Sequence, residues 1–239
     1  MASLDNPRDR AIQAMFDRIA GRYDFLNRLI SFRLDNTWRS QAIKEILGSG
    51  DGFILDLGAG TGDLSFSAAK KIKKGQIVGL DFSLEMLKLA RSKQRLAKTG
   101  EKTWFVQGNA TLCPFKDCTF DGVMTAFVLR NVSDLSLFFA HSFRVLKHGG
   151  RFLSLDMFPP TKSWFSALYS LYFYRLVPRI GGLVGRDPVA YRYLAESVAK
   201  FHSPEKVGEL IQQAGFKRLK IRKFLNGAVC IHVAEKTHK

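Results

Sequence analysis

The stretch Phe53-Ile-Leu-Asp-Leu-Gly-Ala-Gly-Thr-Gly-Asp63 decides the fold of this chain. Its first five residues are mostly apolar and run directly into glycines at positions 58, 60 and 62. A short apolar run that stops at glycines is typical of a buried parallel strand, and glycines permit a sharp turn into a following helix. The sequence therefore predicts that an α/β fold begins here.

Strand and helix patterns alternate on the C-terminal side of this loop. The expected elements are a helix after Asp63, a strand at Gln76–Leu80, a helix at Ser83–Ala97, strands at Thr103–Gln107 and Phe120–Ala126, a helix at Asp134–Leu146 and a strand at Arg151–Met157. Such an order predicts a mostly parallel sheet with helices on both faces.

The C-terminal residues predict a different ending. Ser203-Pro204-Glu205 combines an N-cap, a proline at the first helical position and an early acid, and Gly215 suits a helix C-cap. After that helix, Phe216–Leu225 and Ala228–Glu235 alternate apolar and polar residues around Asn226-Gly227, a dipeptide that tolerates the positive φ angles of a type I′ turn. An antiparallel hairpin is expected. A seven-stranded, mostly parallel sheet closed by such a hairpin resembles the class I methyltransferase fold, which is Rossmann-like.

The remaining segments frame this sheet. Residues 8–30 carry apolar side chains at helical spacing, and a second helix is expected at Asp35–Leu47. Residues 158–200 are rich in aromatic residues but show no strand or helix long enough to belong to the sheet. We expect one methyltransferase domain over residues 1–239, with an N-terminal helical segment (1–48), a sheet core (52–157 and 201–239) and an aromatic cap (158–200).

Composition narrows the class of protein. Of 239 residues, 46% are hydrophobic and 24% charged, which fits a globular chain and excludes a disordered or fibrous one. Lys and Arg number 37 against 21 Asp and Glu, a net charge of +16 that favours an anionic partner, either nucleic acid or a membrane surface. The longest apolar stretch, Trp164–Tyr174, is about half the ~20 residues of a spanning helix. A cytoplasmic protein is expected.

Three cysteines are too few for a disulfide framework, so reduced thiols are expected. Cys113 and Cys118, taken with Cys230 and His232, invite a zinc hypothesis. Their spacing lacks the usual two-residue pairs and Cys230 falls in a predicted hairpin strand, so we expect no metal.

The glycine loop favours S-adenosylmethionine over a dinucleotide. Asp63 stands where the third glycine of the dinucleotide fingerprint would be, so a phosphate would meet a carboxylate. S-adenosylmethionine carries no phosphate, and its ammonium and sulfonium groups suit acids at Asp56 and Asp63. Asp81 ends the second strand, where it can bind both ribose hydroxyls, or it caps the following helix. Asn109 can bind an adenine edge, or it forms only a turn.

Several stretches, in order, resemble the UbiE/MenG family of ubiquinone and menaquinone biosynthesis C-methyltransferases over nearly the whole chain. They are Tyr23-Asp-Phe-Leu-Asn27, Ser31-Phe32, Trp38-Arg39, Leu129-Arg-Asn-Val-Ser-Asp134, Arg144-Val-Leu-Lys147 with Gly149-Gly150, and Tyr191-Arg-Tyr-Leu-Ala-Glu-Ser197. The chain departs from the family at Asp35, where relatives usually have His, at His148 in place of Pro, and at Ala126 in place of a small polar residue.

The resemblance implies roles for named residues. S-adenosylmethionine would be bound by the glycine loop and by the acid and amide after the next two strands: Asp56, Gly58, Gly60, Thr61, Asp81, Asn109 and Ala110. Arg130, Asn131 and Tyr23 would form the reaction site. The alternatives are that Arg130 is a surface arginine before a helix and that Tyr23 is a core aromatic.

The implied reaction places a methyl group on a quinol ring carbon, which is a poor nucleophile until a ring hydroxyl with a pKa near ~10 loses its proton. Arg130 can stabilise the phenolate, because a guanidinium stays charged in a water-poor pocket. For the same reason it is a poor proton acceptor. Asp134, Tyr23, His202 or a bound water could take the proton, and the sequence does not rank them.

The implied substrate is a lipid quinol, either demethylmenaquinol or a polyprenyl-methoxy-benzoquinol. The aromatic stretch Trp164–Tyr174, with Arg175 and Arg179 behind it, would admit an isoprenoid tail, in peripheral contact with an anionic membrane at its inner face. A homodimer is the alternative to a monomer.

An RNA methyltransferase is the competing function for a basic chain. In such enzymes an Asn/Asp-Pro-Pro-aromatic motif follows the fourth strand, but this chain has Ala126-Phe-Val-Leu129 there. Because this motif is missing, we expect no nucleic acid partner. A cofactor-binding protein without turnover is the third hypothesis.

Overall fold

The computed structural model describes residues 6–47, 52–97, 99–160, 172, 175 and 187–238. Within these residues seven strands form one sheet in the order β3-β2-β1-β4-β5-β7-β6. They are β1 (Gly52–Leu57), β2 (Gly75–Asp81), β3 (Thr103–Gln107), β4 (Phe120–Ala126), β5 (Leu146–Met157), β6 (Lys217–Phe224) and β7 (Val229–Glu235). Strands β1 to β5 are parallel, whereas β7 is antiparallel to β5 and β6. The predicted sheet is confirmed.

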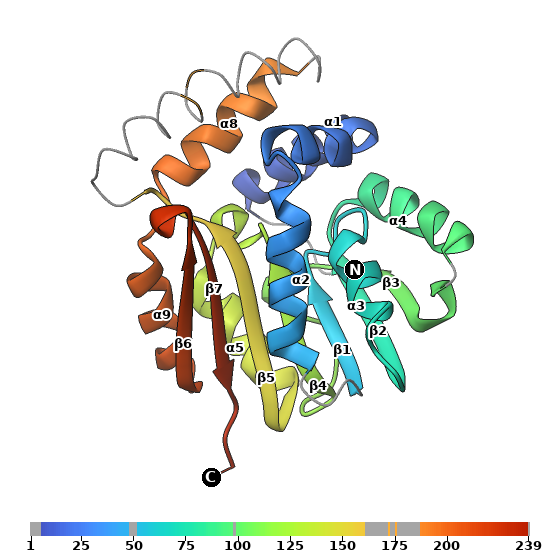
Figure 1. The fold of residues 1–239 in the computed structure, drawn as a ribbon, viewed down its shortest axis with the longest axis vertical. Helices are drawn as coiled ribbons and strands as arrows, with labels where there is room; N and C mark the ends of the chain where they lie inside the picture. Colours follow the sequence, from blue (N-terminus) through green and yellow to red (C-terminus); the bar gives the residue numbers. More distant parts are fainter. Residues whose placement is uncertain are drawn as a thin grey trace.

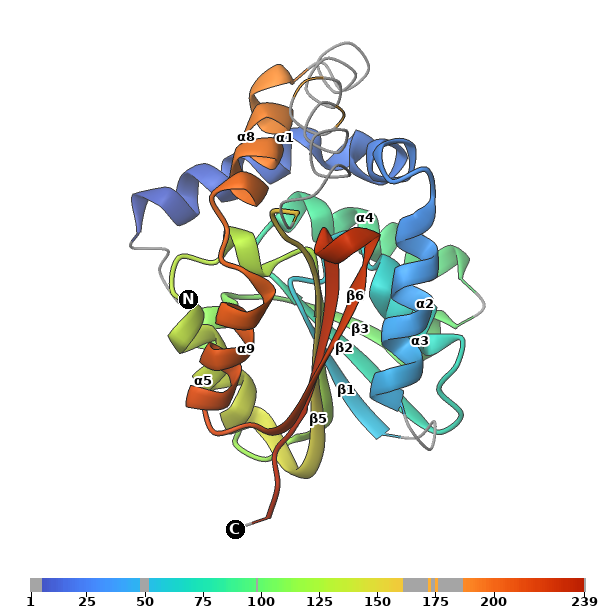
Figure 2. The ribbon, with the colours of Figure 1, turned by 60° about the vertical axis from the view of Figure 1, so that its left-hand side comes forward.

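Helices cover both faces of the sheet and the edge at which the parallel strands end. They are α1 (Pro7–Ile30), α2 (Leu34–Leu47), α3 (Asp63–Ala69), α4 (Leu84–Leu96), α5 (Leu135–Val145), α8 (Pro188–Ala199) and α9 (Pro204–Gln213). Figure 2 shows α2 and α3 on one face and α5 and α9 on the other. Helices α1 and α8 contact each other and lie above the carboxyl ends of the parallel strands (Figure 1). These two helices therefore cover the loops that follow β1 to β4.

The apolar run of β1 is continuous because the strand is covered on both faces. Leu55 and Leu57 are fully buried in the cluster that joins the sheet to α5 and α9, which includes Phe139. Ile54 points the other way and packs with Ile43 of α2. Successive side chains of a strand alternate between faces, so a strand buried on both sides carries no polar face.

The predicted element boundaries agree with the structure except in three places. β5 begins at Leu146 and not Arg151, and its pairing with β4 is irregular between Phe120 and Gly122. The hairpin connection is longer than a two-residue turn: Asn226 and Gly227 have the expected positive φ angles, 52° and 86°, but Leu225 is also left-handed at 47°. Helix α8 was not predicted.

Most of the expected aromatic cap cannot be compared with the structure. The stretch Trp164–Tyr174 and Arg179 lie outside the described residues, apart from Tyr172, whose hydroxyl donates to the carbonyl oxygen of Ile30 at 2.7 Å. None of the described helices is long and apolar enough to cross a lipid bilayer.

Candidate active site

The glycine loop joins β1 to α3 and leaves open space beside its backbone. Gly58 has a φ of 72°, and a Cβ there would lie 2.4 Å from a methyl carbon of Val128, so no other residue fits. Gly60 has a φ of 56°, and a Cβ on it would meet nothing within 4 Å. The first glycine permits close packing against the turn after β4, and the second leaves room for a ligand.

Asp81 ties the glycine loop to the start of α4. Its Oδ2 accepts a hydrogen bond from the Gly60 amide at 2.7 Å, and its Oδ1 accepts one from the Ser83 amide at 2.8 Å. Ser83, and not Asp81, is the N-cap of α4. Burial raises the pKa of Asp81 to about 6, although both amides act in the opposite direction. A carboxylate held at the end of β2 by two amides is suitably placed for the hydroxyls of a ribose.

A cleft of about 50 Å³ lies along the ends of β1, β2 and β3. Gly58, Asp81, Asn109, Ala110 and Asn131 are among its lining residues. The side-chain oxygen of Asn109 accepts hydrogen bonds from the amide and hydroxyl of Thr111. The turn expected at Asn109 therefore exists, and the amide nitrogen of the same side chain is the group that can meet an adenine edge.

A second small cleft, of about 30 Å³, lies on the other side of the glycine loop. Its polar lining residues are Tyr23, Asp24, Arg39, Asp56, Thr61 and Asp63. The Asp56 carboxylate accepts from the Ser65 hydroxyl at 2.6 Å, and burial raises the pKa of Asp56 to about 7. The Thr61 hydroxyl donates to Asp24 at 2.5 Å.

The structure changes the interpretation of Asp63. Its carboxylate contacts three cations, Lys93 at 2.8 Å, Arg28 at 3.5 Å and Arg39 at 3.6 Å. Burial raises the pKa of Asp63, but Lys93 and the two arginines outweigh it and hold the pKa below its usual value. Asp63 therefore organises this cluster, and we do not expect it to be free to bind an ammonium group. Arg39 is the one cationic side chain that lines the cleft among the described residues, and its buried Nε has no hydrogen-bond partner there.

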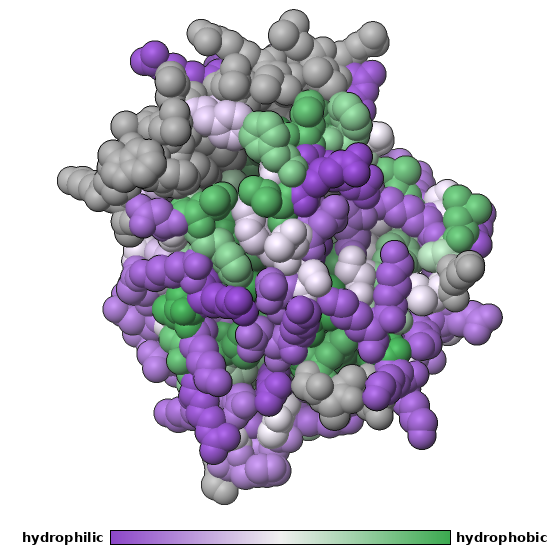
Figure 3. All heavy atoms as spheres, viewed as in Figure 1, coloured by the Kyte–Doolittle hydropathy of each residue, from purple (hydrophilic) through white to green (hydrophobic). Residues whose placement is uncertain are grey.

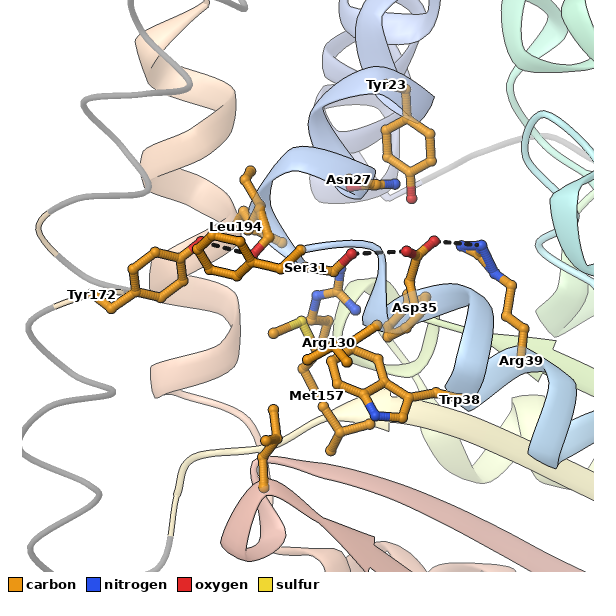
Figure 4. Close-up of a pocket in the computed structure, with 16 residues that line it drawn as sticks. Tyr23, Asn27, Ser31, Asp35, Trp38, Arg39, Arg130, Met157, Tyr172 and Leu194 are labelled. Carbon is orange, nitrogen blue, oxygen red and sulfur yellow. Dashed lines mark hydrogen bonds and ion pairs between the residues drawn. The ribbon is translucent and has the colours of Figure 1, made fainter.

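A larger and mostly apolar cavity of about 290 Å³ opens beneath α1, α2 and α8 (Figure 4). Its walls include Trp38, Phe127, Met157, Leu194 and Val229. Its polar lining residues include Tyr23, Asn27, Ser31, Asp35, Arg39 and Arg130. Since Tyr23 and Arg39 also line the cleft beside the glycine loop, the two spaces share a wall.

Arg130 lines the apolar cavity and is buried, so the interpretation of it as a surface arginine is wrong. It follows β4 in a short 3-10 turn, only 7% of its surface is exposed, and its Nη1 donates to Asp156 Oδ1 at 2.7 Å. Asp156 also accepts hydrogen bonds from the amides of Leu129 and Met157 at 2.8 and 2.7 Å. The Nε of Arg130 is buried and has no partner in the described part of the chain. The guanidinium is thus held through Nη1, whereas the N–H of its Nε donates to none of the described residues.

Tyr23 lies where the spaces meet, since it lines both the cavity and the cleft beside the glycine loop. Burial raises the pKa of its hydroxyl above 10, with Arg130 and a hydrogen bond from Asn27 opposing the shift. At neutral pH the hydroxyl is therefore protonated and can donate a hydrogen bond. Asn131 does not line the cavity; its side-chain oxygen accepts from Tyr193, and it borders the first cleft.

The three side chains considered as proton acceptors, Asp134, Tyr23 and His202, do not all lie in the same space. Asp134 caps α5 by accepting from the Leu137 amide, and it lines a polar cleft of about 540 Å³ together with His202. Arg130 borders this polar cleft as well as the apolar cavity. Of the three proposed side chains, only Tyr23 lines the cavity.

The cysteines do not come together. Cys113 and Cys230 are buried, Cys118 is exposed, and all three are free thiols. Burial raises the pKa of Cys113 to about 11 and of Cys230 to about 12. In the part of the chain that the structure describes, no three His, Cys, Asp or Glu residues are grouped so as to hold a metal ion.

Comparison with known proteins identifies the family. The model of the ubiE/COQ5 methyltransferase family matches residues 4–236. The chain belongs to this family. Among its relatives, the demethylmenaquinone methyltransferase of Thermus thermophilus is 40% identical over 223 residues, which cover 93% of this chain and 100% of the relative. The ubiquinone/menaquinone biosynthesis C-methyltransferase UbiE of Geotalea uraniireducens is 40% identical over 226 residues, which cover 94% and 96%.

Solved structures agree on the fold of this ubiE/COQ5 family member. An S-adenosylmethionine-dependent methyltransferase of Thermotoga maritima matches with a TM-score of 0.65 at 21% identity and covers 94% of this chain and 99% of its own. Phosphoethanolamine N-methyltransferase 2 of Haemonchus contortus, in complex with S-adenosylmethionine, matches with a TM-score of 0.59 at 16% identity, covering 83% of this chain and 52% of its own. These structures confirm the class I methyltransferase fold, and membership of the ubiE/COQ5 methyltransferase family supports S-adenosylmethionine as the cofactor.

The three departures from the family lie in different surroundings. Asp35 is buried in the wall of the cavity, and Ala126 lines the cleft beside the glycine loop. His148 stacks on His238 near the C-terminus, at the opposite end of the sheet from the cavity (Figure 1). Asp35 is thus the departure that touches the space available to a substrate.

Proposed function

We propose that this chain transfers a methyl group from S-adenosylmethionine to a ring carbon of demethylmenaquinol, giving menaquinol, and accepts a polyprenyl-methoxy-benzoquinol as a second substrate. The observation that carries the proposal is the apolar cavity, which shares Tyr23 and Arg39 with the glycine-loop cleft and has the buried guanidinium of Arg130 among its lining residues. An aromatic ring fits such walls, and a ring oxygen needs such a donor.

The residues present fit the cofactor. Asp81 would accept hydrogen bonds from the ribose hydroxyls, and Asn109 with Ala110 would contact the adenine. The buried and unpartnered Nε of Arg39 offers a donor to the methionine carboxylate on the far side of the glycine loop. When bound, S-adenosylmethionine supplies a methyl group that its sulfonium already activates, so the protein has to supply position and charge more than bond-breaking help.

Arg130 would stabilise the developing phenolate. Its Nη1 is held by Asp156, which fixes the plane of the guanidinium, and its free Nε can donate to the ring oxygen in a site with little water. Tyr23 would add a second donor, because its raised pKa keeps the hydroxyl protonated. With Asp134 and His202 outside the cavity, water that reaches Arg130 through the polar cleft is the acceptor that this arrangement favours.

The mouth of the cavity suits contact with a membrane. Phe32 and Leu34 line the cavity and are 71% and 40% exposed, and Phe25 and Leu29 on α1 are 59% and 40% exposed. Arg33 is exposed between Phe32 and Leu34. Figure 3 shows apolar side chains gathered around the upper ends of β6 and β7, with mostly polar residues below them. We propose that this surface rests on the anionic inner face of the cytoplasmic membrane, from which a lipid quinol would enter.

The decisive experiment measures methyl transfer from labelled S-adenosylmethionine to reduced demethylmenaquinone and to the benzoquinol precursor, each in detergent, with total RNA alongside. Label in both quinols supports the proposal, and label in only one of them removes the other as a substrate. Label in RNA and in neither quinol would overturn it. Sedimentation of the same protein decides between a monomer and a homodimer.

A further inference from the structure

A buried carboxylate faces the cavity from the first turn of α2. Asp35 is 2% exposed; its Oδ1 accepts from the Ser31 hydroxyl at 2.8 Å, and its Oδ2 accepts from Arg39 Nη1 at 3.2 Å. Figure 4 shows this chain of three side chains along one wall. Burying a carboxylate is costly even when a cation compensates it, and an apolar residue would fill this place without that cost. Stability alone therefore does not explain a carboxylate at this position, which indicates a functional role.

The cavity offers one strong acceptor among several donors. Of the described residues that line it, Asp35 alone carries a carboxylate. Arg130 lines the same cavity, and its buried Nε has no hydrogen-bond partner in the described residues. A dihydroxy aromatic ring can donate to a carboxylate with one hydroxyl while its other oxygen accepts from a guanidinium. The oxidised ring has two carbonyl oxygens, which only accept, so it can accept a hydrogen bond from Arg130 but cannot donate one to Asp35.

We propose that Asp35 distinguishes the oxidation state of the ring: it accepts a hydrogen bond from a hydroxyl of the quinol and repels the carbonyl oxygen of the quinone. This inference rests on the proposed function, in which a quinol occupies the cavity. Only the quinol can be a substrate, because the carbons of a quinone ring are electrophilic and cannot take an electrophilic methyl group. Without discrimination, the oxidised form would occupy the cavity as an inhibitor.

The size of the effect follows from the interaction. A hydrogen bond to a charged group in a buried site is worth a factor of about 10 to 100 in affinity. The quinone forgoes this hydrogen bond, because its carbonyl oxygens only accept, and the carboxylate repels them. We therefore expect the quinol to bind at least about tenfold more tightly than the quinone.

The test compares 2,3-dimethyl-1,4-naphthoquinone with its quinol. Neither has a free carbon in the ring that carries the oxygens, so neither is methylated there and the quinone has no open position at which the exposed thiol of Cys118 could add. Dissociation constants are measured by anaerobic equilibrium dialysis on the full chain, on Asp35→Asn and on Asp117→Asn. Asp117 is 71% exposed at its side chain, does not line the cavity and serves as a charge-matched control. We expect the quinol preference in the full chain and in Asp117→Asn, and a ratio near one in Asp35→Asn, whose amide can donate to a carbonyl.

The ratio of two affinities protects the test against partial loss of stability, because both ligands are bound by the same folded fraction. Should Asp35→Asn not fold, as judged by circular dichroism, Asp35→His replaces it, since a neutral imidazole can donate or accept and should also abolish the preference. An equal affinity of the unaltered chain for both forms, or an unchanged ratio in the folded variant, overturns the role of Asp35 alone. Binding of neither form by the unaltered chain contradicts the proposed function itself.

Discussion

Arg130 and Asp156 form a buried ion pair, with 2.7 Å between Nη1 and Oδ1, at the end of the two central strands β4 and β5. Their side chains are 5% and 0% exposed. Asp156 accepts two backbone amides in addition to the guanidinium, so it is the fixed partner and Arg130 is the group it orients. The arginine assigned to the reaction is therefore positioned by a residue of the sheet and not by the loop that carries it.

Replacing Asp156 should destabilise the protein strongly. Asp156→Asn leaves the Arg130 guanidinium buried without its counter-charge, and breaking such a pair costs about 3 to 5 kcal/mol in free energy of unfolding. The exposed pair of Lys206 and Glu209 supplies the control, since Glu209→Gln should cost less than about 1 kcal/mol. Urea denaturation measures both. If Asp156→Asn has the same free energy of unfolding as the unaltered chain, the buried ion pair does not contribute to stability as predicted.

Removing Arg130 should affect the reaction and not the cofactor. Arg130→Ala deletes the donor to the phenolate, and loss of one such donor lowers the rate by about 100- to 1,000-fold. The dissociation constant of S-adenosylmethionine, measured by calorimetry, should stay within about twofold because Arg130 does not line the cleft that contains Asp81. Methyl transfer by Arg130→Ala at a near unaltered rate would remove Arg130 from the mechanism.

Removing Asp81 should weaken the binding of the cofactor. A charge-assisted hydrogen bond is worth about 1.5 to 3 kcal/mol, so Asp81→Ala should weaken S-adenosylmethionine binding by roughly 10- to 100-fold. Asp117→Asn should bind the cofactor as the unaltered chain does. If the affinity of Asp81→Ala is unchanged, the ribose is held elsewhere.

The pKa of Asp81 predicts how the affinity for the cofactor depends on pH. Burial raises that pKa to about 6, so the carboxyl is ionised at pH 7.5 and mostly protonated at pH 5. A ribose that donates to the ionised form binds less well as the pH falls through 6, by up to about tenfold between pH 7 and pH 5. Calorimetry across this range checks the slope. Asp81→Asn, which does not titrate, should lose the part of the slope near pH 6.

Much of the fold could be predicted because its signals are local. The apolar run of β1, the glycines after it and the Ser203-Pro204 start of α9 each lie within a few residues, and all appear as expected. Helix α8 also has a local signal, since Asp187 is its N-cap and Pro188 its first residue, but the aromatic composition of residues 158–200 obscured it.

The candidate site could be predicted only in part because its partners are distant in the sequence. Asp156 lies 26 residues after Arg130, and Arg39 reaches Asp63 only because α2 packs beside α3. An acid inside the apolar strand β5 was the one available signal for Asp156. No local pattern could show that Asp134 and His202 lie in the polar cleft and outside the apolar cavity.

The exposed apolar residues of α1 provide a test of membrane contact that leaves the cavity intact. Phe25 and Leu29 do not line the cavity, and burying one such side chain in the interface is worth about 1.5 to 3 kcal/mol. Phe25→Ser combined with Leu29→Ser should therefore weaken binding to phosphatidylglycerol-containing vesicles by at least about tenfold in a flotation assay. Leu96→Ser, at an 87% exposed site at the end of α4, supplies the control and should bind as the unaltered chain does. Methylation of a quinol without a tail should be unchanged in both, because that substrate does not need the bilayer. Vesicle binding that survives the double substitution but is lost in Leu96→Ser would place the membrane on a different face of the molecule.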